Sequence, residues 1–554
     1  MKNVVLLAIN AKYVHSSLAV WLMSAGIEQF GDEKYDVKIV EATIHHEVSE
    51  IAEKIYAHKP DYVGISTYIW NASMLPALLM TLRGKLPNVK VIMGGPEACY
   101  NCEYWLINGA DYILGGEGEY TFPALLEKLD SCVEFGGKDK LILPVKPQYV
   151  TGMRTPDASI STADAVGASV VPIDPYTDEY FAHLGGRLAY LETSRGCPFT
   201  CAFCLSADYA VSFFPLDTVK EQILKLSKSG ARTIKLVDRT FNCNAKRAHE
   251  LFEYIISLDT PCCFHFEVAA DLFDERTLKL LKAAPPGRIQ FEAGLQSFYG
   301  PTLEASMRKT DSKKAERSIR SILKGGNIHL HIDLIAGLPY ENLSEFKNSF
   351  DRAFSLRAHT LQLGFLKLLH GSELRRKAPE LGIVFSASPP YEIISSPWLR
   401  PEDLEIIKLS ENALQHTYNK GRFLASLEYV FSSEKMRAFD FFLMLGRAAP
   451  NHGTDLPEYA TRIYRACEKL DGVDKDILLE RMTYDWLSMV KGKNMPEILR
   501  NRDPRRSEIS KIAEENLGRK IRRDEAVILE SGVGMYVDSE AGNPVTGLYK
   551  VFIT

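Results

Sequence analysis

The stretch Ser194-Arg195-Gly196-Cys197-Pro198-Phe199-Thr200-Cys201-Ala202-Phe203-Cys204 places three cysteines within eight residues. It directly follows an apolar segment, Ala189–Thr193, that we expect to be a strand. A loop of this kind can wrap three thiolates around three irons of a cubane cluster. Such a cluster normally takes four thiolates, so a site that supplies three leaves one iron open for an outside ligand. We therefore predict that Cys197, Cys201 and Cys204 bind a [4Fe-4S] cluster.

Zinc is the alternative metal for this loop. A structural zinc site would need a fourth Cys or His nearby, and His183 is the closest candidate upstream. Cys99-x-x-Cys102 and the pair Cys262-Cys263 could bind another metal, but we interpret them as buried or idle thiols. Ten cysteines in 554 residues are too few for a disulfide scaffold. The sequence therefore predicts a single cluster in a reducing compartment.

Around the cysteines, residues 187–400 alternate apolar strand patterns with helical patterns. Such units predict a partial (β/α)6 barrel, whose chemistry lies at the carboxyl ends of the strands. The six expected strands are Ala189–Thr193, Thr233–Asp238, Cys263–Val268, Arg288–Gly294, His329–Ile335 and Thr360–Leu368.

Residues 1–135 show the same alternation with shorter repeats, which predicts a Rossmann-like, doubly wound α/β domain. Its expected strands are Val4–Asn10, Val37–Glu41, Tyr62–Ser66, Val89–Gly94 and Asp111–Leu114, with helices such as Val48–His58 and Ala72–Leu86 between them. Residues 136–186 are rich in Gly, Pro, Ser, Thr and Asp and are predicted to be a linker. Residues 401–554 form a mostly helical C-terminal domain, with short strands expected in Ala526–Thr554.

Composition narrows the range of partners. The formal charge of −5 and a pI near 6.3 give no global reason to expect nucleic acid. In Leu499–Val527 many basic residues alternate with acidic ones, which indicates a solvated helix and predicts no salt-sensitive RNA binding. No apolar run approaches the roughly 20 residues of a membrane span, and the start shows no signal peptide. We expect a cytoplasmic protein without a membrane partner.

The pattern Cys-x-x-x-Cys-x-aromatic-Cys resembles the signature of the radical S-adenosylmethionine (SAM) superfamily. The resemblance implies that the amino and carboxylate groups of SAM chelate the open iron. An electron from the reduced cluster would then break the sulfonium bond and release a 5'-deoxyadenosyl radical. Phe203, beside the last cysteine, would lie near the adenine.

Further barrel motifs are similar to those of the oxygen-independent coproporphyrinogen oxidase and methylthiotransferase branches. They are Leu295-Gln296-Ser297-Phe298 with Arg308, and Asp333-Leu334-Ile335-Ala336-Gly337-Leu338-Pro339. The resemblance implies that Gln296 and Asp333 approach the SAM ribose hydroxyls and that Arg308 pairs with the SAM carboxylate.

Two acidic residues complete the expected SAM site. Glu267 matches a family Glu on the third strand that approaches the sulfonium or amino group. Val237-Asp238-Arg239-Thr240-Phe241 resembles the Asp-Asp-x-Phe strand end of the cobalamin-binding branch, with Arg239 in place of the second acid. Asp238 could accept hydrogen bonds from the SAM ammonium.

Three strand ends of the amino-terminal domain carry small or flexible residues. Together they resemble the cobalamin-binding domain that precedes many radical SAM cores. The implied cobalamin contacts are Ser66, Thr67, Gly94, Gly95, Gly116, Glu117 and Gly118. The signature Asp-x-His-x-x-Gly is missing around His45 and His46, so we expect no histidine ligand beneath the cobalt. His15 is a further candidate for a substrate or cofactor contact.

The resemblance implies a cobalamin-dependent radical SAM enzyme that uses a [4Fe-4S] cluster, SAM and cobalamin, most commonly to methylate an unactivated carbon. The alternatives are a cobalamin-binding enzyme that performs a cyclisation, rearrangement or lyase reaction, and a non-catalytic sensor of redox state or cofactor supply. The expected partners are a small-molecule or peptide substrate and an electron donor such as flavodoxin or ferredoxin.

Overall fold

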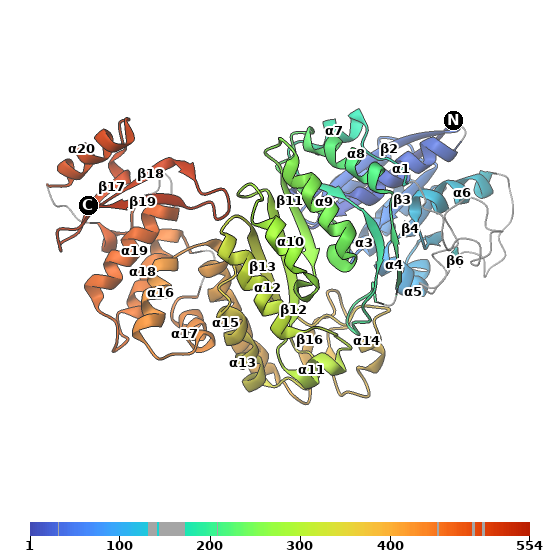
Figure 1. Cartoon of the computed structure of the whole chain (residues 1–554). Helices are drawn as coiled ribbons and strands as arrows, with labels where there is room; N and C mark the ends of the chain where they lie inside the picture. Colours follow the sequence, from blue (N-terminus) through green and yellow to red (C-terminus); the bar gives the residue numbers. More distant parts are fainter. Residues whose placement is uncertain are drawn as a thin grey trace. The chain divides into compact units, whose positions relative to one another are not determined.

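Figure 1 shows the helices and strands of the computed structural model. The chain divides into two compact units. Unit one comprises Met1–Val268, Ser306–Lys309 and Lys367–Ile393, and unit two comprises Ala269–Ala305, Thr310–Leu366 and Ile394–Thr554. The structure describes residues 1–31, 33–130, 141–142, 172–207, 209–450, 454–489, 494–500 and 505–554. Most of the linker predicted at residues 136–186 therefore lies outside the described residues.

The first sheet of unit one is parallel and has the order β2-β1-β3-β4-β5-β6. Its strands are β1 (Lys2–Asn10), β2 (Tyr35–Thr43), β3 (Tyr62–Ser66), β4 (Lys90–Gly94), β5 (Tyr112–Leu114) and β6 (Leu141–Ile142). The chain moves from β1 outward to β2 and then returns to β3 on the other side. The topological switch point, where ligands bind such sheets, lies between the carboxyl ends of β1 and β3. The predicted Rossmann-like domain is confirmed.

Helices cover both faces of this sheet. α2 (Val48–Tyr56) and α3 (Leu75–Lys85) bury their apolar residues against one face. On the opposite face, Phe122 of α6 (Gly118–Asp130) packs closely over Gly64 and Leu6. α1 (Leu18–Phe30) packs against α6, and a Cβ on Gly26 would collide with the backbone carbonyl of Glu119. The close approach of these two helices fixes the start of α6. Two short helices, α4 (Pro96–Tyr100) and α5 (Cys102–Ile107), lie between β4 and β5.

The second sheet has the order β14-β13-β12-β11-β10-β7. In unit one, β7 (Ala189–Leu191), β10 (Thr233–Leu236) and β11 (Cys263–Val268) pair in parallel. In unit two, β12 (Ile289–Gln296), β13 (His329–Ala336) and β14 (Thr360–Phe365) also pair in parallel. The helices that alternate with these strands are α8 (Leu216–Ser227), α9 (Ala245–Ser257), α10 (Glu275–Leu281), α11 (Gly300–Ala305), α12 (Ser312–Gly325) and α13 (Leu343–Phe354). The predicted partial (β/α)6 barrel is confirmed.

The sequence predicted a plain loop at the cysteine stretch, but the structure differs. Its first residues form β8 (Ser194–Cys197), which pairs antiparallel with β9 (Tyr209–Phe213). Cys197 therefore ends a strand, while Cys201 and Cys204 lie in the connection between the two strands. The hairpin ladder fixes the direction in which the chain enters this connection.

The C-terminal part of unit two is mostly helical, as predicted. Its helices are α15 (Pro401–His416), α16 (Leu424–Ser433), α17 (Ala438–Ala448), α18 (Leu456–Cys467), α19 (Lys475–Met489) and α20 (Arg506–Leu517). They are followed by an antiparallel sheet of β17 (Ala526–Ile528), β18 (Gly534–Gly542) and β19 (Tyr549–Ile553). Arg519 pairs with Glu525 at 3.0 Å and lies 3.6 Å from both Asp538 and Glu540, which favours the solvated, charge-paired interpretation of this region. Among the residues that the structure describes, no helix combines the length and apolar character needed to cross a membrane.

A segment that leads from the barrel returns to unit one. It contains α14 (Glu373–Lys377) and β15 (Val384–Phe385), and β15 pairs with β16 (Ile393–Ser395). In this segment the hydroxyl of Tyr391 donates a hydrogen bond of 2.5 Å to the buried carboxylate of Glu97. A Cβ on Gly371 would collide with the ring of Tyr100. The segment is therefore closely packed against α4.

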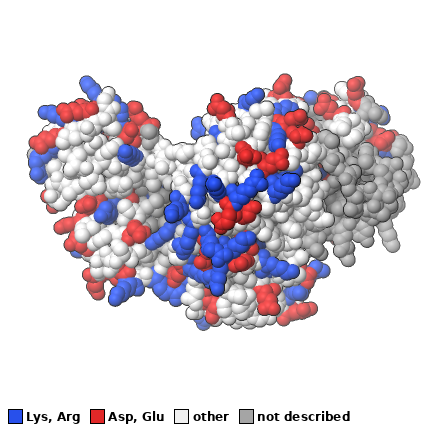
Figure 2. All heavy atoms as spheres, in the orientation of Figure 1, with Lys and Arg blue, Asp and Glu red and all other residues white. Residues whose placement is uncertain are grey.

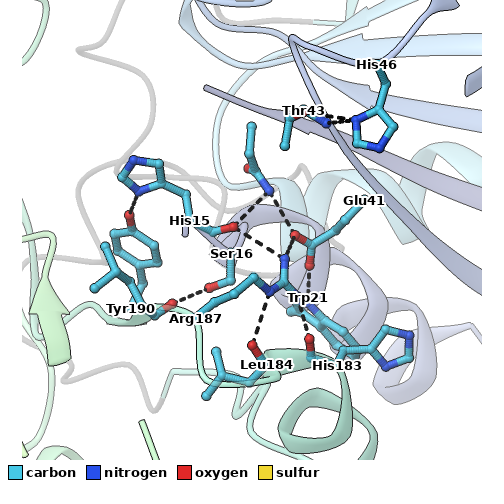
Figure 3. Close-up of polar contacts among 12 residues, drawn as sticks. His15, Ser16, Trp21, Glu41, Thr43, His46, His183, Leu184, Arg187 and Tyr190 are labelled. Carbon is cyan, nitrogen blue, oxygen red and sulfur yellow. Dashed lines mark hydrogen bonds and ion pairs between the residues drawn. The ribbon is translucent and has the colours of Figure 1, made fainter. Parts of the chain in front are cut away.

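A buried ion pair joins the amino-terminal sheet to the chain that enters the barrel (Figure 3). Arg187, after α7 (Asp178–Leu184), lies 2.7 Å from the carboxylate of Glu41 on β2. The same carboxylate accepts hydrogen bonds from Asn10 at 2.9 Å and Trp21 at 3.3 Å. Because both members of the pair are only about one-tenth exposed, we expect the pair to hold the two segments in register.

His15 takes part in the same junction. Its Nδ1 lies 2.6 Å from the hydroxyl of Tyr190 on β7, and the neighbouring Ser16 donates to the carbonyl of Leu188 at 2.7 Å (Figure 3). Burial, with Lys12 and Lys235 nearby, lowers the pKa of His15. These contacts give His15 a structural role, while its predicted contact with a substrate or cofactor stays a prediction.

Candidate cofactor sites

The three cysteines of the predicted cluster site share one connection in unit one. Cys197 and Cys201 are buried and Cys204 is half-buried. The amide of Cys204 donates to the carbonyl of Cys201 at 3.0 Å, and the amide of Ser206 donates to the sulfur of Cys204 at 3.3 Å. Burial raises the pKa of Cys204. Phe203, the predicted adenine contact, is half-buried between the last two cysteines.

Two distant segments hold the backbone of this connection. The amide of Ala202 donates to the carbonyl of Ser306 at 2.9 Å, and its carbonyl accepts from the amide of Leu374 at 2.7 Å. Both bonds fix the peptide groups between Cys201 and Cys204. Hydrogen bonds from two other segments of the protein therefore hold this connection in place.

Arg308, the predicted partner of the SAM carboxylate, lies beside the cysteines, and its contact with SAM stays a prediction. Its Nη1 donates to the sulfur of Cys201 at 3.5 Å, and its guanidinium lies 5.6 Å from the centre of the Phe199 ring. Iron–sulfur clusters are held by cysteine sulfurs, and a guanidinium can donate a hydrogen bond to such a sulfur. The donor set therefore fits an iron–sulfur cluster: three thiols in one connection, an amide and a guanidinium directed at their sulfurs. No group of three or more His, Cys, Asp or Glu side chains in the described part of the chain is arranged to hold a single metal ion.

Asp238 supports the root of the cysteine hairpin. Its carboxylate accepts hydrogen bonds from the amide of Thr193 at 3.0 Å, from the Thr193 hydroxyl at 2.7 Å and from the hydroxyl of Ser194. Burial raises its pKa to about 6, although these hydrogen bonds act in the opposite direction. The geometry gives Asp238 a positioning role, and its contact with the SAM ammonium stays a prediction.

Glu267 lies near the end of β11 and is about one-third exposed. Its carboxylate lies 3.5 Å from Nζ of Lys235 on the neighbouring strand β10. This pair holds the carboxylate at the strand end where a SAM contact was expected. The contact itself stays a prediction.

Gln296 and Asp333 lie close together in unit two: Gln296 ends β12, and Asp333 lies within the neighbouring strand β13. The pairing of β12 with β13 shifts between Gly294 and Gln296, and Gly294 stands opposite Asp333. Gln296 has a φ of 67°, and its amide folds so closely over Gly294 that a Cβ there would collide with it. The structure therefore brings these two predicted ribose contacts close together.

The predicted cobalamin contacts lie at the carboxyl edge of the first sheet, but several are engaged by the protein itself. The hydroxyl of Ser66 donates to the carbonyl of Leu7 at 3.3 Å, and that of Thr67 to the carbonyl of Ile65 at 3.4 Å. Thr67 is fully buried, so its side chain has no exposed surface for a ligand in this structure. The expected contact at Thr67 therefore gains no support from the geometry.

The glycines at this edge permit close approach of backbone to backbone. Gly95 has a φ of 98°, and a Cβ there would lie 2.6 Å from the carbonyl oxygen of Thr67. A Cβ on Gly94 would lie 3.2 Å from the carbonyl oxygen of Leu114, and one on Gly118 3.2 Å from Met23. Gly116 has a φ of 83°. Packing within the protein therefore favours glycine at these positions, and their contact with cobalamin stays a prediction.

Glu117 does not face the open edge of the sheet. Its carboxylate lies 2.9 Å from the guanidinium of Arg195, two residues before Cys197. Glu119 contacts the same guanidinium at 2.5 Å. The loop predicted to bind cobalamin is thus joined to the chain that carries the cysteines, and direct contact of Glu117 with cobalamin stays a prediction.

Sequence reasoning missed an aromatic pair at the topological switch point. The rings of Tyr68 and Trp70, just after β3, stack with centroids 4.3 Å apart, and Trp70 donates to the carbonyl of Ile9 on β1 at 3.0 Å. Trp70 is 42% exposed. A Tyr-x-Trp pattern directly after a predicted strand was the available signal, and such a pair offers a flat apolar surface to a large ring system.

Comparisons with known proteins cover three parts of the chain. The family described as B12 binding domain matches residues 4–126, and the Radical SAM superfamily matches residues 191–353. A family described as Protein of unknown function (DUF4080) matches residues 379–528. These matches coincide with the first sheet, with most of the barrel, and with the segment that runs from the barrel into the helical C-terminal part.

Curated relatives are distant. An uncharacterized methyltransferase, PH0819, of Pyrococcus horikoshii is 26% identical over 56% of this chain and 68% of its own length. The anaerobic magnesium-protoporphyrin IX monomethyl ester cyclase of Synechocystis is 25% identical over 54% and 60%. The cobalamin-dependent radical SAM methyltransferase TokK of Streptomyces tokunonensis is 24% identical over 54% and 45%. The chain thus spans less than two thirds of the length of the last two.

Solved structures share the fold. The cobalamin-dependent SAM radical enzyme OxsB aligns with a TM-score of 0.58 at 14% identity, over 87% of this chain and 78% of its own. The radical SAM methyltransferase TsrM of Kitasatospora setae, solved with cobalamin and a [4Fe-4S] cluster, aligns with a TM-score of 0.54 at 18% identity, over 72% and 83%. At these identities the likeness shows the fold alone.

Glu341, shortly after β13, is expected to make the free energy of unfolding depend on pH. It is fully buried, and one of its oxygens accepts hydrogen bonds from Ser297 at 2.6 Å and Ser349 at 2.7 Å. Burial raises its pKa to about 7. A raised carboxyl pKa means that the folded state holds a proton that the unfolded state has released. This contribution is fully present below the unfolded pKa and is lost as the pH rises through about 7.

We therefore expect Glu341→Gln to flatten the pH dependence of the free energy of unfolding. Between about pH 5 and about pH 8 the wild-type protein should lose about 2 kcal/mol relative to this variant, measured by chemical denaturation at each pH. Glu380→Gln, at an exposed position, should keep the wild-type profile. Parallel profiles for wild type and Glu341→Gln would contradict the assignment.

Proposed function

We propose that this chain, which belongs to the cobalamin-dependent radical SAM family and carries a B12-binding domain ahead of a radical SAM domain, methylates an unactivated carbon atom of its substrate. The observation that carries the proposal is the cysteine connection Cys197–Cys204 with Arg308 at its sulfur, joined through Arg195 to the glycine-rich loop of the first sheet. The two domains imply a [4Fe-4S] cluster, SAM and cobalamin. When bound, these groups supply the radical and the methyl group.

The residues of the chain would bind and orient these groups. Cys197, Cys201 and Cys204 would hold the cluster, with the backbone of Ala202 fixed by Ser306 and Leu374. Arg308 carries a guanidinium that suits the carboxylate of SAM, and Gln296 and Asp333 offer oxygens that suit its ribose hydroxyls. The Tyr68–Trp70 pair would cover part of the cobalamin face and exclude water there.

Several distant relatives bear methyltransferase names, which supports methylation. Other relatives are named cyclases of magnesium-protoporphyrin IX monomethyl ester, and a cyclisation is therefore the second candidate. The substrate is expected to be a small molecule or a peptide. Unit two, whose C-terminal part matches a family of unknown function, gives no further indication of its identity.

Product analysis separates the two candidates. Anaerobically reconstituted protein, incubated with SAM, a reductant and cell extract, is expected to form S-adenosylhomocysteine and 5'-deoxyadenosine in about equal amounts, together with a methylated product. Mass spectrometry identifies all three. Formation of 5'-deoxyadenosine without S-adenosylhomocysteine would favour the cyclisation. The Cys201→Ala variant is the control and should form neither compound.

A basic surface on unit two supports an acidic carrier, such as flavodoxin or ferredoxin, as the proposed electron donor. Figure 2 shows Lys and Arg side chains gathered over α10 and α12, which pack side by side. Their exposed basic residues are Arg276, Lys279, Lys282, Lys313, Arg317, Arg320 and Lys324. None of them forms an ion pair with a residue that the structure describes. We call this surface the basic face, and charge complementarity with an acidic partner raises the rate of encounter.

Charge reversal tests this partner. The variant Lys313→Glu/Arg317→Glu/Arg320→Glu/Lys324→Glu is expected to raise the KM for the protein reductant at least about tenfold. SAM cleavage with dithionite should keep its wild-type rate, because a small reductant needs no docking surface. The variant Arg465→Glu/Lys469→Glu is the control, since these exposed positions, on α18 and just after it, lie away from the basic face in sequence. An unchanged KM for the protein reductant would exclude docking at the basic face.

A further inference from the structure

Arg195 lies between the two loops to which the family assigns cofactors. On the barrel side, it belongs to β8 and stands two residues before Cys197. Its Nη1 lies 2.9 Å from Glu117, and its Nη2 lies 2.5 Å from Glu119 and 2.8 Å from Glu192. Glu117 and Glu119 follow β5 of the first sheet, whereas Glu192 follows β7 of the barrel. One guanidinium therefore binds carboxylates from both domains, all within unit one.

The burial of these groups makes the contact energetically important. The side chains of Glu117 and Glu119 are 6% exposed, and that of Arg195 is 20% exposed. Burial alone would lower the pKa of Arg195, but the three carboxylates raise it. Without the guanidinium, three like charges would remain close together in a medium that screens them poorly. Arg195 thus allows the loop Gly115–Glu119 and the start of the cysteine connection to lie close together.

Both sides of this contact are stiff. The start of α6, which carries Glu119, is fixed by the close approach of Gly26. On the other side, the ladder of β8 with β9 holds Arg195, and Asp238 holds the residues Thr193 and Ser194 before it. A displacement of one loop is therefore passed to the other rather than absorbed locally.

We propose that Arg195 makes cobalamin binding and cluster assembly mutually stabilising. The inference rests on the proposed function in one respect: it assumes that the chain binds both cobalamin and the cluster. Cobalamin bound at the loop Gly115–Glu119 would favour one position of this loop, and the contacts of Glu117 and Glu119 with Arg195 would pass that position to the start of the cysteine connection. Thermodynamic reciprocity then requires that an assembled cluster strengthens cobalamin binding by the same factor, for which about 5-fold to 150-fold is typical of coupled sites.

The test measures binding, not turnover. The Kd of hydroxocobalamin is determined by absorbance and tryptophan quenching for the full chain, once with the cluster reconstituted and once without it. Wild-type protein is expected to bind cobalamin at least about fivefold more tightly with the cluster. In Arg195→Gln the two Kd values should be equal within error, while iron content and circular dichroism show that the cluster and the fold persist.

Two further variants keep the result decisive. Glu119→Gln removes one carboxylate of the contact but leaves Arg195. It should reduce the ratio of the Kd without the cluster to the Kd with the cluster, and it provides the test if Arg195→Gln fails to fold. Arg83→Gln is the matched control, because Arg83 pairs with Asp111 before β5, at the opposite edge of the same sheet, and it should keep the wild-type ratio. A wild-type ratio of one, or an unchanged ratio in both Arg195→Gln and Glu119→Gln, overturns the inference. Failure of the wild-type chain to bind either group would instead refute the proposed function.

Discussion

Replacing any one of Cys197, Cys201 or Cys204 with Ala is expected to remove the brown cluster and abolish 5'-deoxyadenosine formation. The three cysteines are predicted to ligate three of the four irons of the cubane. The loss of one cysteine therefore leaves two irons without a protein ligand. Iron and sulfide analysis after anaerobic reconstitution measures the first effect, and chromatography of the SAM products measures the second.

Cys102→Ala is the matched control for this series. Cys102 is half-buried and lies in a Cys-x-x-Cys pair of the first domain, so its loss tests the alternative that this pair binds metal. The control variant should retain the iron content and SAM cleavage of the wild-type protein. Wild-type iron content in Cys201→Ala would refute the cluster assignment.

Replacing Arg187 with Met is expected to lower the free energy of unfolding of unit one by about 3 kcal/mol. The substitution leaves the buried carboxylate of Glu41 with hydrogen bonds from Asn10 and Trp21 but without its cation. Chemical denaturation, followed by tryptophan fluorescence because Trp21 lies at the junction, measures the loss.

Lys225→Met provides the comparison for Arg187→Met. The pair of Lys225 with Asp174 is similar in length, 2.8 Å, but nearly half-exposed on both sides. An exposed pair contributes little, so the expected loss is below about 1 kcal/mol. Equal losses of the free energy of unfolding in the two variants would mean that burial does not determine how much the Arg187–Glu41 pair contributes to stability.

The strand pattern was predictable because each strand of a parallel sheet is buried on both faces and reads as an apolar run. β3 (Tyr62–Ser66) and β11 (Cys263–Val268) have the bounds expected from the sequence. Glu117 shows the limit of this approach. Its position in a glycine-rich turn was predictable, but its pairing with Arg195 joins residues far apart in the chain and leaves no periodic signal.

The cysteine hairpin shows the same limit. β8 and β9 are short and show no regular alternation of apolar and polar residues, and their pairing arises from the tertiary fold. The spacing of Cys197, Cys201 and Cys204 indicates an iron–sulfur cluster but does not predict the backbone geometry of the connection that carries these cysteines. Thr67 marks a further difference: a hydroxyl at a strand end suggested a ligand contact, but local packing buries it completely.

The hydrogen bonds of Ala202 have a consequence for biosynthesis. The carbonyl between Cys201 and Phe203 is held by Leu374, a residue that leaves the ribosome long after the cysteines do. A nascent chain that ends before Leu374 lacks this bond and the packing of the segment Lys367–Ile393. The contacts that fix the native shape of the cysteine connection are therefore complete only late in translation, after the last strand of the barrel has been made.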